Sequence, residues 1–283
     1  VIINPGWNID KISNLLVEKE IIKNKNIFKL WIKINYLEKK IKYGEYDFSG
    51  QNSINLVTKK LIKGDTINRF ITIKEGISHY DFISLLESKG KKTSNIIIPE
   101  FIIADTYTYK FHDKIEKILN DIQKKSYELI KKEYILSKKK MDYNLLKSDY
   151  ILASIIEKET GKKSEMNKIA GVFLNRLKIK MRLQSDPTVI FSITKGKKFE
   201  RKLTRKDLKF ESKYNTYKIK GLPPTAISIP SIYSIKAVLN PYRGNYFYFV
   251  ANKKGGHFFS ESYEEHLNKI RQLKMNKNKT SNE

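Results

Sequence analysis

Hydrophobic residues recur at helical spacing along most of the chain, and short stretches of alternating pattern separate them. The amino-terminal part begins with a strand, continues with two helices, and ends with a strand and a third amphipathic helix. The strands are predicted at 1–4 and 43–48. The first helix is predicted to begin at Ile9, the second to span 25–34, and the third to end at Gly64. Asn8 stands where an N-cap of the first helix belongs, and 49–52 read as a turn. The pattern predicts a small α+β domain over residues 1–68.

The middle of the chain, residues 69–147, reads as a connecting segment. Residues 69–74 alternate like a strand, and Ser78 can cap a helix that follows the turn at Gly76. From 112 to 147 the chain is rich in Lys and carries apolar residues on one side of a helical pattern. We expect a connecting helix with a solvated basic face there.

The third part, residues 148–275, is predicted to be a mixed α+β domain. Ser148 or Asp149 can cap the first helix, and Asp186 before Pro187 can cap the third. The predicted elements are helices at 150–160, 165–178, 188–193 and 231–239, a hairpin of 246–251 with 257–260, and a last helix opened by a Ser262–Glu265 capping box. A polar tail follows at 276–283. The fold class is therefore α+β throughout.

The charge and the composition limit the classes of partner that this chain is expected to bind. The formal net charge is +26, which suggests nucleic acid, anionic lipid or another acidic polymer, or else a merely solvated surface. Only seven of the 56 basic residues are Arg, whereas recognition of bases and phosphates relies on the guanidinium fork. We therefore expect no nucleic-acid partner, and favour peptidoglycan or membrane if the charge is functional.

Two further features of the composition bear on compartment and anchoring. The chain has no Cys, so disulfides and thiol nucleophiles are excluded. No run approaches the roughly 18 apolar residues that a membrane helix needs, so this chain is expected to be soluble. Its start at Val1, within a strand-like run, leaves room for an anchor upstream.

One helix carries a carboxyl group in an unusual place. On a helical wheel centred on Ile155, Glu159 falls at about 40°, within the apolar stripe, and Glu157 at about 200°, on the opposite side. A carboxyl group on an apolar face is harder to ionise, because loss of hydration disfavours the charged form. We therefore expect Glu159 to suit general-acid chemistry, and Glu157 to meet water or a salt-bridge partner. A structural Glu159, tied to Arg or Lys at the rim of a core, is the alternative.

Cleavage of a glycosidic bond needs an acid that protonates the leaving oxygen. Ordinary glycosidases add a second carboxylate, and Asp186 is the nearby candidate although its place before Pro187 suits a helix cap. A single acid suffices if the nucleophile is a hydroxyl of the sugar itself, because tethering gives it a high effective concentration.

Seven sequence blocks carry a family resemblance. They are ASIIEKET at 153–160, VFLNRL at 172–177, MRLQSDPTV at 181–189, YNTY at 214–217, GLPP at 221–224, YFVA at 248–251 and GHF at 256–258. In this order they resemble the endolytic murein transglycosylases of the MltG (YceG-like) family. The resemblance covers essentially the whole chain and is strongest over 150–266.

The resemblance implies a peptidoglycan lytic transglycosylase. Such a lyase cleaves the MurNAc-GlcNAc β-1,4 bond in nascent strands and leaves a 1,6-anhydro-MurNAc end, without a cofactor. The family's catalytic acid, the second Glu of the Glu-Lys-Glu-Thr block, corresponds to Glu159. The resemblance also implies a LysM-like domain at 1–68 and peptidoglycan synthases as partners. It implies a single-pass anchor, missing from this chain, that holds the catalytic part on the outer (periplasmic) face of the cytoplasmic membrane.

Six polar residues match family positions that we expect to line the glycan cleft. They are Gln184, Asp186, Thr188, Tyr214, Asn215 and Thr216. Turn and cap chemistry is an equal alternative for each, since Asn, Asp and Thr satisfy their own backbone in loops. Asn175 and Arg176 are either supports of Glu159 or an ordinary surface pair.

The chain departs from the family pattern between the expected domains. Where the family has Pro-Glu-Gly and Pro-Asp-Thr-Tyr, this chain has Phe101 after Glu100 and Ala104 before Asp105. The departure concerns the turn geometry there and not the chemistry. The four His residues lack metal-ligand spacing, so no metal is expected.

Three other functions compete with this interpretation. A non-catalytic peptidoglycan-binding scaffold would keep the glycan contacts without turnover. A conventional hydrolase would leave reducing ends in place of anhydro ends. A nucleic-acid-binding protein is suggested only by the charge.

Overall fold

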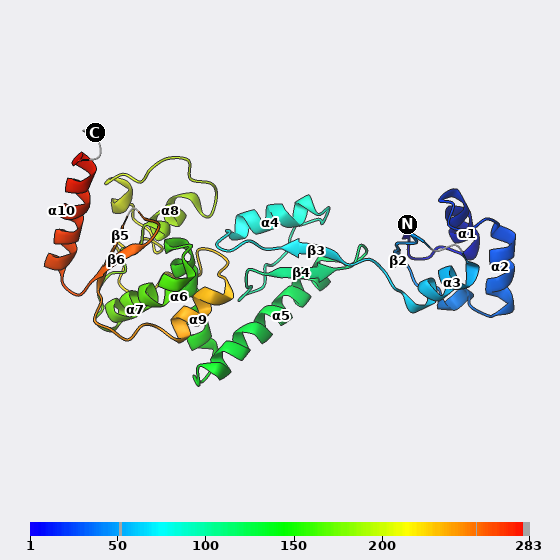
Figure 1. Ribbon diagram of the computed structural model, residues 1–283, viewed down its shortest axis with the longest axis horizontal. Coiled ribbons are helices and arrows are strands. Elements are labelled where there is room, and N and C mark those ends of the chain that lie inside the picture. The colour runs from blue at the N-terminus through cyan, green and yellow to red at the C-terminus, as the bar shows by residue number, and fades with distance from the viewer. Residues whose placement is uncertain (51–52, 253, 280–283) are drawn as a thin grey trace. The chain divides into compact units, whose positions relative to one another are not determined.

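The computed structural model describes residues 1–50, 53–252 and 254–279, with side chains up to Met275. The chain forms two compact units (Figure 1). Unit 1 contains residues 1–71 and 107–114, and unit 2 contains 72–106 and the chain from Ile115 onward. Helices and short antiparallel strands occur in the molecule, which confirms the α+β class. The expected turn at 49–52 lies partly outside the described residues.

Unit 1 is a three-helix unit with a short two-stranded sheet. Its elements are β1 (Ile2–Ile3), α1 (Ile9–Glu18), α2 (Lys25–Ile34), the 3-10 turn η1 (Glu38–Lys40), β2 (Gly44–Glu45) and α3 (Ile54–Lys63). Strand β1 pairs antiparallel with β2. The Asn8 side chain accepts from the Lys11 amide at 3.0 Å, which confirms the predicted N-cap. Gly64 ends α3 in the left-handed conformation, at φ 72°.

The core of unit 1 is formed by the apolar stripes of the three helices and by aromatic residues of the second strand region. Its buried members include Leu16, Phe28, Ile32, Tyr46 and Leu61. The hydroxyl of Tyr46 donates to the Lys42 carbonyl at 2.6 Å, so the buried ring keeps its polar end paired.

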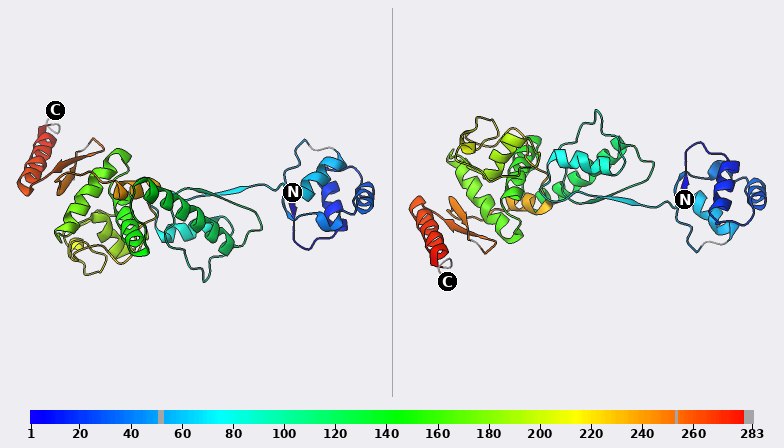
Figure 2. Two further views of the ribbon diagram at one scale, coloured as in Figure 1. Left: turned by 90° about the horizontal axis from the view of Figure 1, so that it is seen from below. Right: turned by 90° about the horizontal axis from the view of Figure 1, so that it is seen from above.

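Unit 2 contains the helices from α4 onward and the strands β5 and β6 (Figure 2). They are α4 (His79–Ser88), α5 (Ile115–Leu136), α6 (Tyr143–Glu159), α7 (Lys163–Lys178), α8 (Asp186–Thr194), η2 (Asp207–Lys209), α9 (Ile232–Leu239), β5 (Tyr248–Ala251), β6 (His257–Ser260) and α10 (Tyr263–Lys279). Strands β3 (Arg69–Thr72) and β4 (Thr106–Tyr109) pair where the chain passes between the units. Residues 69–147, expected as one connecting segment, thus contribute to both units.

Helices α6, α7 and α9 pack together and enclose the main core of unit 2 (Figure 1). Ile155, Ile156, Ile169, Phe173 and Val238 are buried there. The predicted hairpin is confirmed: β5 pairs antiparallel with β6, and Phe249 opposes Phe259. It packs beside α10.

The start of α6 differs from the sequence prediction. The helix begins at Tyr143, and Asp142 caps it by accepting from the Leu145 amide at 3.0 Å. Neither Ser148 nor Asp149 is a cap, since the Ser148 hydroxyl donates to the Leu145 carbonyl within the helix and Asp149 accepts from Tyr134. The expected domain boundary at residue 148 therefore falls inside a helix, and the helical stretch predicted over 112–147 is two helices.

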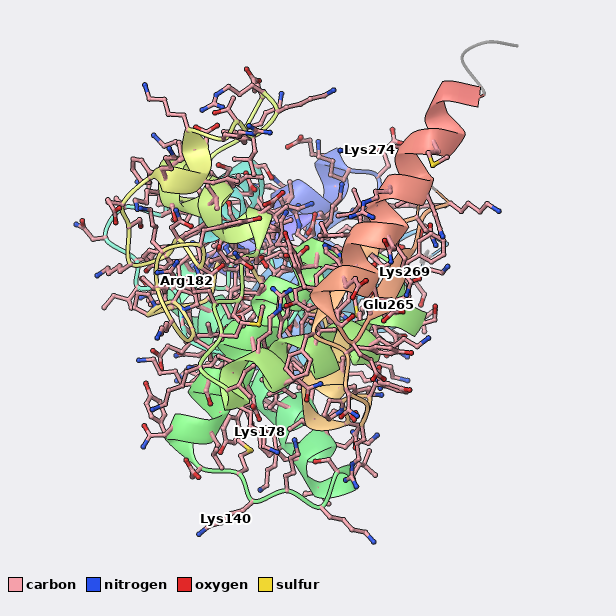
Figure 3. All side chains as sticks on the ribbon, turned by 90° about the vertical axis from the view of Figure 1, so that its left-hand side faces the viewer. Lys140, Lys178, Arg182, Glu265, Lys269 and Lys274 are labelled. Atoms are coloured by element: carbon pink, nitrogen blue, oxygen red, sulfur yellow. The ribbon has the colours of Figure 1, made fainter. Side chains whose placement is uncertain are left out.

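Charged residues at the surface of unit 2 lie on several different helices and loops. Figure 3 shows Lys140 in the loop between α5 and α6, and Lys274 on α10. Along α10, Glu265 and Lys269 are one turn apart and pair at 2.6 Å. The helix continues to Lys279, so residues 276–279 of the predicted polar tail are helical. Among the described residues, every helix is too short or too polar to cross a bilayer.

Candidate active site

Glu159 is the last residue of α6 and is partly buried. Residues 151–157 before it are buried, so the helix brings this carboxyl group to the edge of the core. Its Oε1 accepts a 2.5 Å hydrogen bond from the hydroxyl of Ser185, which lies directly before α8. The end of α6 and the start of α8 therefore meet at this carboxyl group.

The surroundings of Glu159 change its acidity. Loss of hydration on burial raises the pKa of Glu159 to about 7, although the Ser185 hydrogen bond acts to lower it. The neighbouring carboxylate of Asp186 raises this pKa further, and the Arg176 guanidinium lowers it. Near neutral pH both the acid and the carboxylate are populated, so the group can give up a proton and take one back.

Ser185 is held in place by two buried threonines. Its amide donates to Thr216 Oγ1 at 2.9 Å, and its carbonyl accepts from Thr188 Oγ1 at 2.6 Å. The two threonine hydroxyls lie 2.8 Å apart, and the Gln184 amide donates to the Thr216 carbonyl at 3.1 Å. This network fixes the serine that contacts Glu159.

Arg176 supports the same site from α7. Its side chain is buried and donates to the carbonyls of Leu183 and Phe247, each at 2.7 Å. These bonds hold the segment before Ser185 in place. The guanidinium charge also lies close enough to lower the pKa of Glu159. Asn175 instead holds the backbone of Gly244, through a 2.7 Å bond from its Nδ2. The two residues are thus not a surface pair.

Asp186 is exposed at the start of α8. The N-cap of α8 is Ser185, and Asp186 is the first helical residue, so the predicted capping role of Asp186 is wrong. Its Oδ1 accepts from the hydroxyl of Tyr217 at 2.7 Å. Burial, together with this bond, raises the pKa of Tyr217, which therefore stays a neutral donor.

The six predicted cleft residues do not all reach the surface. Thr188, Asn215 and Thr216 are fully buried, whereas Gln184 and Asp186 are exposed and Tyr214 is intermediate. Thr188, Thr216 and Gln184 join Glu159 through the Ser185 segment.

Tyr214 and Asn215 make contacts away from Glu159. The Tyr214 hydroxyl bonds Thr225 Oγ1 at 2.8 Å, and Asn215 donates to the Phe210 carbonyl at 2.7 Å. Three of the six residues therefore present side chains at the surface, at least in part, and the other three are buried.

Glu157 has a different environment from the one predicted. It is 8% exposed, and its Oε2 accepts from the Ser231 amide at 2.8 Å and from the hydroxyls of Ser231 and Ser234 at 2.6 and 2.8 Å. These donors belong to the amino-terminal turn of α9, which packs on the side of α6 that was expected to face solvent. The prediction of water or a salt-bridge partner is wrong because α6 is covered on both sides.

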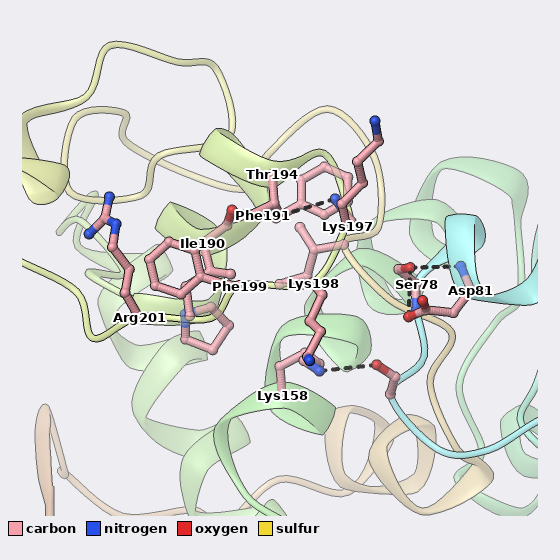
Figure 4. A pocket seen from close by; sticks show the side chains of 14 residues that line it. Ser78, Asp81, Lys158, Ile190, Phe191, Thr194, Lys197, Lys198, Phe199 and Arg201 are labelled. Carbon is pink, nitrogen blue, oxygen red and sulfur yellow. Dashed lines mark hydrogen bonds between the residues drawn. The ribbon is translucent and has the colours of Figure 1, made fainter.

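A cavity of about 560 Å³ lies beside the same elements (Figure 4). Lys158 of α6, Pro187 and Phe191 of α8, and the loop that carries Lys197 and Phe199 contribute to its walls. The chain neighbours of Glu159 and Asp186 thus border this cavity.

Two members of the site are not among the six residues that were predicted to line the cleft. Ser185 and Tyr217 both lie within the blocks that carry the family resemblance, beside residues that were nominated. Their role depends on contacts across 26 and 31 positions of the chain, which local patterns do not reveal.

Comparisons with known proteins find the same family that the sequence blocks resemble. The YceG-like family model matches residues 1–272. An endolytic murein transglycosylase of Bacillus subtilis is 29% identical over 92% of this chain and 81% of its own length. One of Streptococcus pneumoniae is 26% identical over 92% of this chain, which spans only 56% of that relative. The crystal structure of a YceG-like protein from Listeria monocytogenes is similar with a TM-score of 0.56 and 30% identity, over 95% of this chain and 97% of that one.

Proposed function

The chain belongs to the YceG-like family, and we propose that it is an endolytic peptidoglycan lytic transglycosylase in which Glu159 is the single acid and base. The substrate is the MurNAc-GlcNAc β-1,4 bond within nascent strands, and the product is a 1,6-anhydro-MurNAc end. The observation that carries this proposal is the partly buried Glu159 carboxyl group, with a pKa near 7 and a hydroxyl donor fixed on one oxygen.

In the first step, protonated Glu159 gives its proton to the oxygen between the two sugars. The bond from the anomeric carbon of MurNAc to that oxygen breaks, and GlcNAc leaves with a hydroxyl group. The Ser185 hydrogen bond and the Arg176 charge both favour the carboxylate that remains, so they assist this proton transfer.

In the second step, the Glu159 carboxylate takes the proton of the MurNAc 6-hydroxyl. The oxygen of that hydroxyl forms a bond to the anomeric carbon and closes the anhydro ring. Glu159 is protonated again at the end, and water is not consumed. The tethered hydroxyl makes a second catalytic carboxylate unnecessary.

Two kinds of residue surround this reaction in the proposal. Gln184, Asp186 and Tyr214 offer polar groups to the glycan, since their side chains are exposed or partly exposed. Thr188 and Thr216 act as positioning residues through Ser185. Asn215, which is buried, positions the loop that carries Tyr214.

Unit 1 is proposed to bind glycan as a LysM-like domain over residues 1–68. A cavity of about 280 Å³ in this unit is lined by Asn4, Trp7, Asn8 and Tyr43, among others. Aromatic faces together with amide groups suit a sugar, which has both apolar and hydroxyl-bearing surfaces.

The place of action follows from the family resemblance. We propose that an anchor helix outside this chain holds the protein in the cytoplasmic membrane with the catalytic part on the outer face, beside peptidoglycan synthases. The relatives named endolytic murein transglycosylases support a cell-wall substrate.

Product analysis tests this function directly. Uncrosslinked glycan strands are incubated with the protein in water enriched in ¹⁸O, and the ends are identified by mass spectrometry. The proposal predicts 1,6-anhydro ends without ¹⁸O. Reducing ends that contain ¹⁸O would instead identify a hydrolase, and intact strands bound by the protein would identify a scaffold.

A further inference from the structure

The cavity beside Lys158 and Pro187 has walls that suit a peptide (Figure 4). Its volume of about 560 Å³ lies in the range of small-ligand sites. Apolar surface comes from Ile190, Phe191 and Phe199. Such surface can cover the aliphatic side chains of a short peptide, while polar groups at the rim remain free to bind its charges.

The charges of the cavity favour an anion. Lys158 Nζ donates to the Gly76 carbonyl at 3.2 Å, and Lys197 Nζ lies 5.6 Å from the ring centre of Tyr80. Within the described part of the chain, neither lysine is in a salt bridge. The Asp81 carboxylate of the lining is engaged in the capping box of α4, where it accepts from Ser78.

The other two cations of the lining already have acidic partners. Arg201 pairs with Asp207 through bonds of 2.5 and 2.7 Å, and Lys198 pairs with the exposed Glu200 at 2.9 Å. The positive charge left without an acidic partner is therefore that of Lys158 and Lys197.

Two residues that line this cavity are chain neighbours of residues in the candidate active site. Lys158 precedes Glu159, and Pro187 follows Asp186. From Pro187 to Thr194 the α8 helix rises about 10 Å, and an extended peptide covers that distance in about three residues. A substituent of a sugar held at Glu159 can therefore reach along this cavity.

We propose that this cavity binds the acidic stem peptide attached to the MurNAc residue at the cleavage point. A peptide carboxylate lies between Lys158 and Lys197, and aliphatic side chains lie against Phe191 and Phe199. The inference rests on the proposed function and adds a specificity: strands that carry peptides are preferred to bare strands.

The test compares two substrates. One is an uncrosslinked strand with its peptides, and the other is the same strand stripped by an amidase. For Lys197→Ala and Phe199→Ala we expect the ratio of kcat/KM on peptide-bearing to stripped strands to fall roughly three- to tenfold, the effect of losing one charged or apolar contact. Lys178→Ala, at the end of α7 and outside the cavity, removes the same charge and keeps the wild-type ratio.

A binding measurement separates this inference from the proposed function. Calorimetry with N-acetylmuramyl pentapeptide is expected to show binding to Glu159→Gln and weaker binding when Lys197→Ala is added. No binding by Glu159→Gln at millimolar peptide, or an equal loss on both strands in every cavity variant, overturns the inference. A wild-type protein that cleaves neither strand refutes the proposed function, and the peptide titration still decides the subsite.

A separate observation concerns α2 in unit 1. Phe28 and Ile32 bury one side of this helix. Apolar side chains also occupy a side that faces away from the core; they are Ile27, Leu30, Trp31 and Ile34, exposed by 58, 58, 39 and 65%. Their spacing of three, four and seven residues places them on one face.

The charged residues of α2 are all Lys. Lys25, Lys29 and Lys33 lie on the helix, which contains no acidic residue, but Lys29 Nζ pairs with the Asp10 carboxylate of α1 at 2.6 Å. An exposed apolar face with Trp, on a helix whose charged residues are Lys, is typical of helices that lie in the interface of an anionic membrane. We infer that this face of α2 docks on an anionic lipid surface, with Lys33, which borders the face beside Leu30, next to the headgroups.

Vesicle sedimentation tests the α2 inference. The wild-type chain is expected to bind vesicles that contain phosphatidylglycerol, and a Leu30→Ser/Ile34→Ser variant to bind at least tenfold more weakly although its charge is unchanged. Ile135→Ser/Leu136→Ser on α5 replaces two residues that are 67 and 64% exposed and serves as the matched control. Equal binding of all three proteins, or self-association through α2 without vesicle binding, overturns the inference.

Discussion

The Ser185 hydroxyl donates a 2.5 Å hydrogen bond to Oε1 of Glu159 and so connects the turn before α8 with the end of α6. Burial raises the pKa of Glu159, and this bond opposes that rise. The acid strength of the candidate catalyst is therefore a balance between lost hydration and one fixed donor.

Ser185→Ala is expected to move the pH profile. Without the hydroxyl, the pKa of Glu159 rises, so the alkaline limb of kcat/KM shifts to higher pH, and the maximal rate falls about tenfold because the carboxylate is stabilised less. The measurement is anhydro-end formation between pH 5 and 9. Ser192→Ala removes another buried hydroxyl of α8, one that donates to the Thr188 carbonyl, and should leave the profile in place. A similar shift in both variants would contradict the assigned role of Ser185.

Glu159 also links stability to pH. Its folded pKa of about 7 lies above its ordinary value of 4.5, so folding favours the protonated form, and its contribution to stability declines as pH rises from about 4.5 through 7. Glu159→Gln removes this loss, worth up to about 3 kcal/mol. We expect the variant to gain thermal stability over wild type at pH 8 and little at pH 4.5. An advantage that is the same at both pH values would argue against the raised pKa.

Glu157→Gln is expected to damage the fold more than the chemistry. The Gln carbonyl oxygen can take the place of Oε2, but a neutral acceptor binds the donors from Ser231 and Ser234 more weakly than a carboxylate does, at a cost of about 2 to 3 kcal/mol over the three bonds. The melting temperature should drop, whereas folded protein at low temperature should still form anhydro ends. Loss of activity without loss of stability would instead place Glu157 in the reaction.

Phe101 occupies a backbone conformation that suits glycine. Its φ is 62°, and its ring contacts those of Tyr143 and Tyr150 edge-on. Replacing it with Ala or Gly removes the same packing, but only Gly relieves the left-handed strain of about 1 to 2 kcal/mol. After the greater freedom of unfolded glycine is subtracted, Phe101→Gly should be more stable than Phe101→Ala by about 0.5 to 1 kcal/mol in urea unfolding. The reverse order would contradict the strained geometry.

Local sequence patterns predicted the features that depend on a single helix. The position of Glu159 on the apolar stripe and the Asn8 cap are of this kind, because spacing and capping chemistry act within a few residues. The burial of Glu157 depends on donors 74 and 77 positions away, so a wheel drawn from α6 alone could not reveal it.

Competing local signals explain the remaining differences. Asp142, Ser148 and Asp149 are all capping residues, and the pattern alone does not choose among them. The helix starts at the earliest of the three because its first turns bury Leu146 and Tyr150 against the core of unit 2. The return of 107–114 to unit 1 likewise depends on packing and not on any local sequence signal.

Mass spectrometry of glycan strands digested by wild-type and Glu159→Gln proteins, at equal folded concentration checked by circular dichroism, tests whether Glu159 is the catalyst. We expect 1,6-anhydro-MurNAc ends from the wild type and at least a thousandfold fewer from Glu159→Gln, since the lone proton donor and acceptor is lost. Anhydro ends at a similar rate from both proteins would contradict the assignment of Glu159.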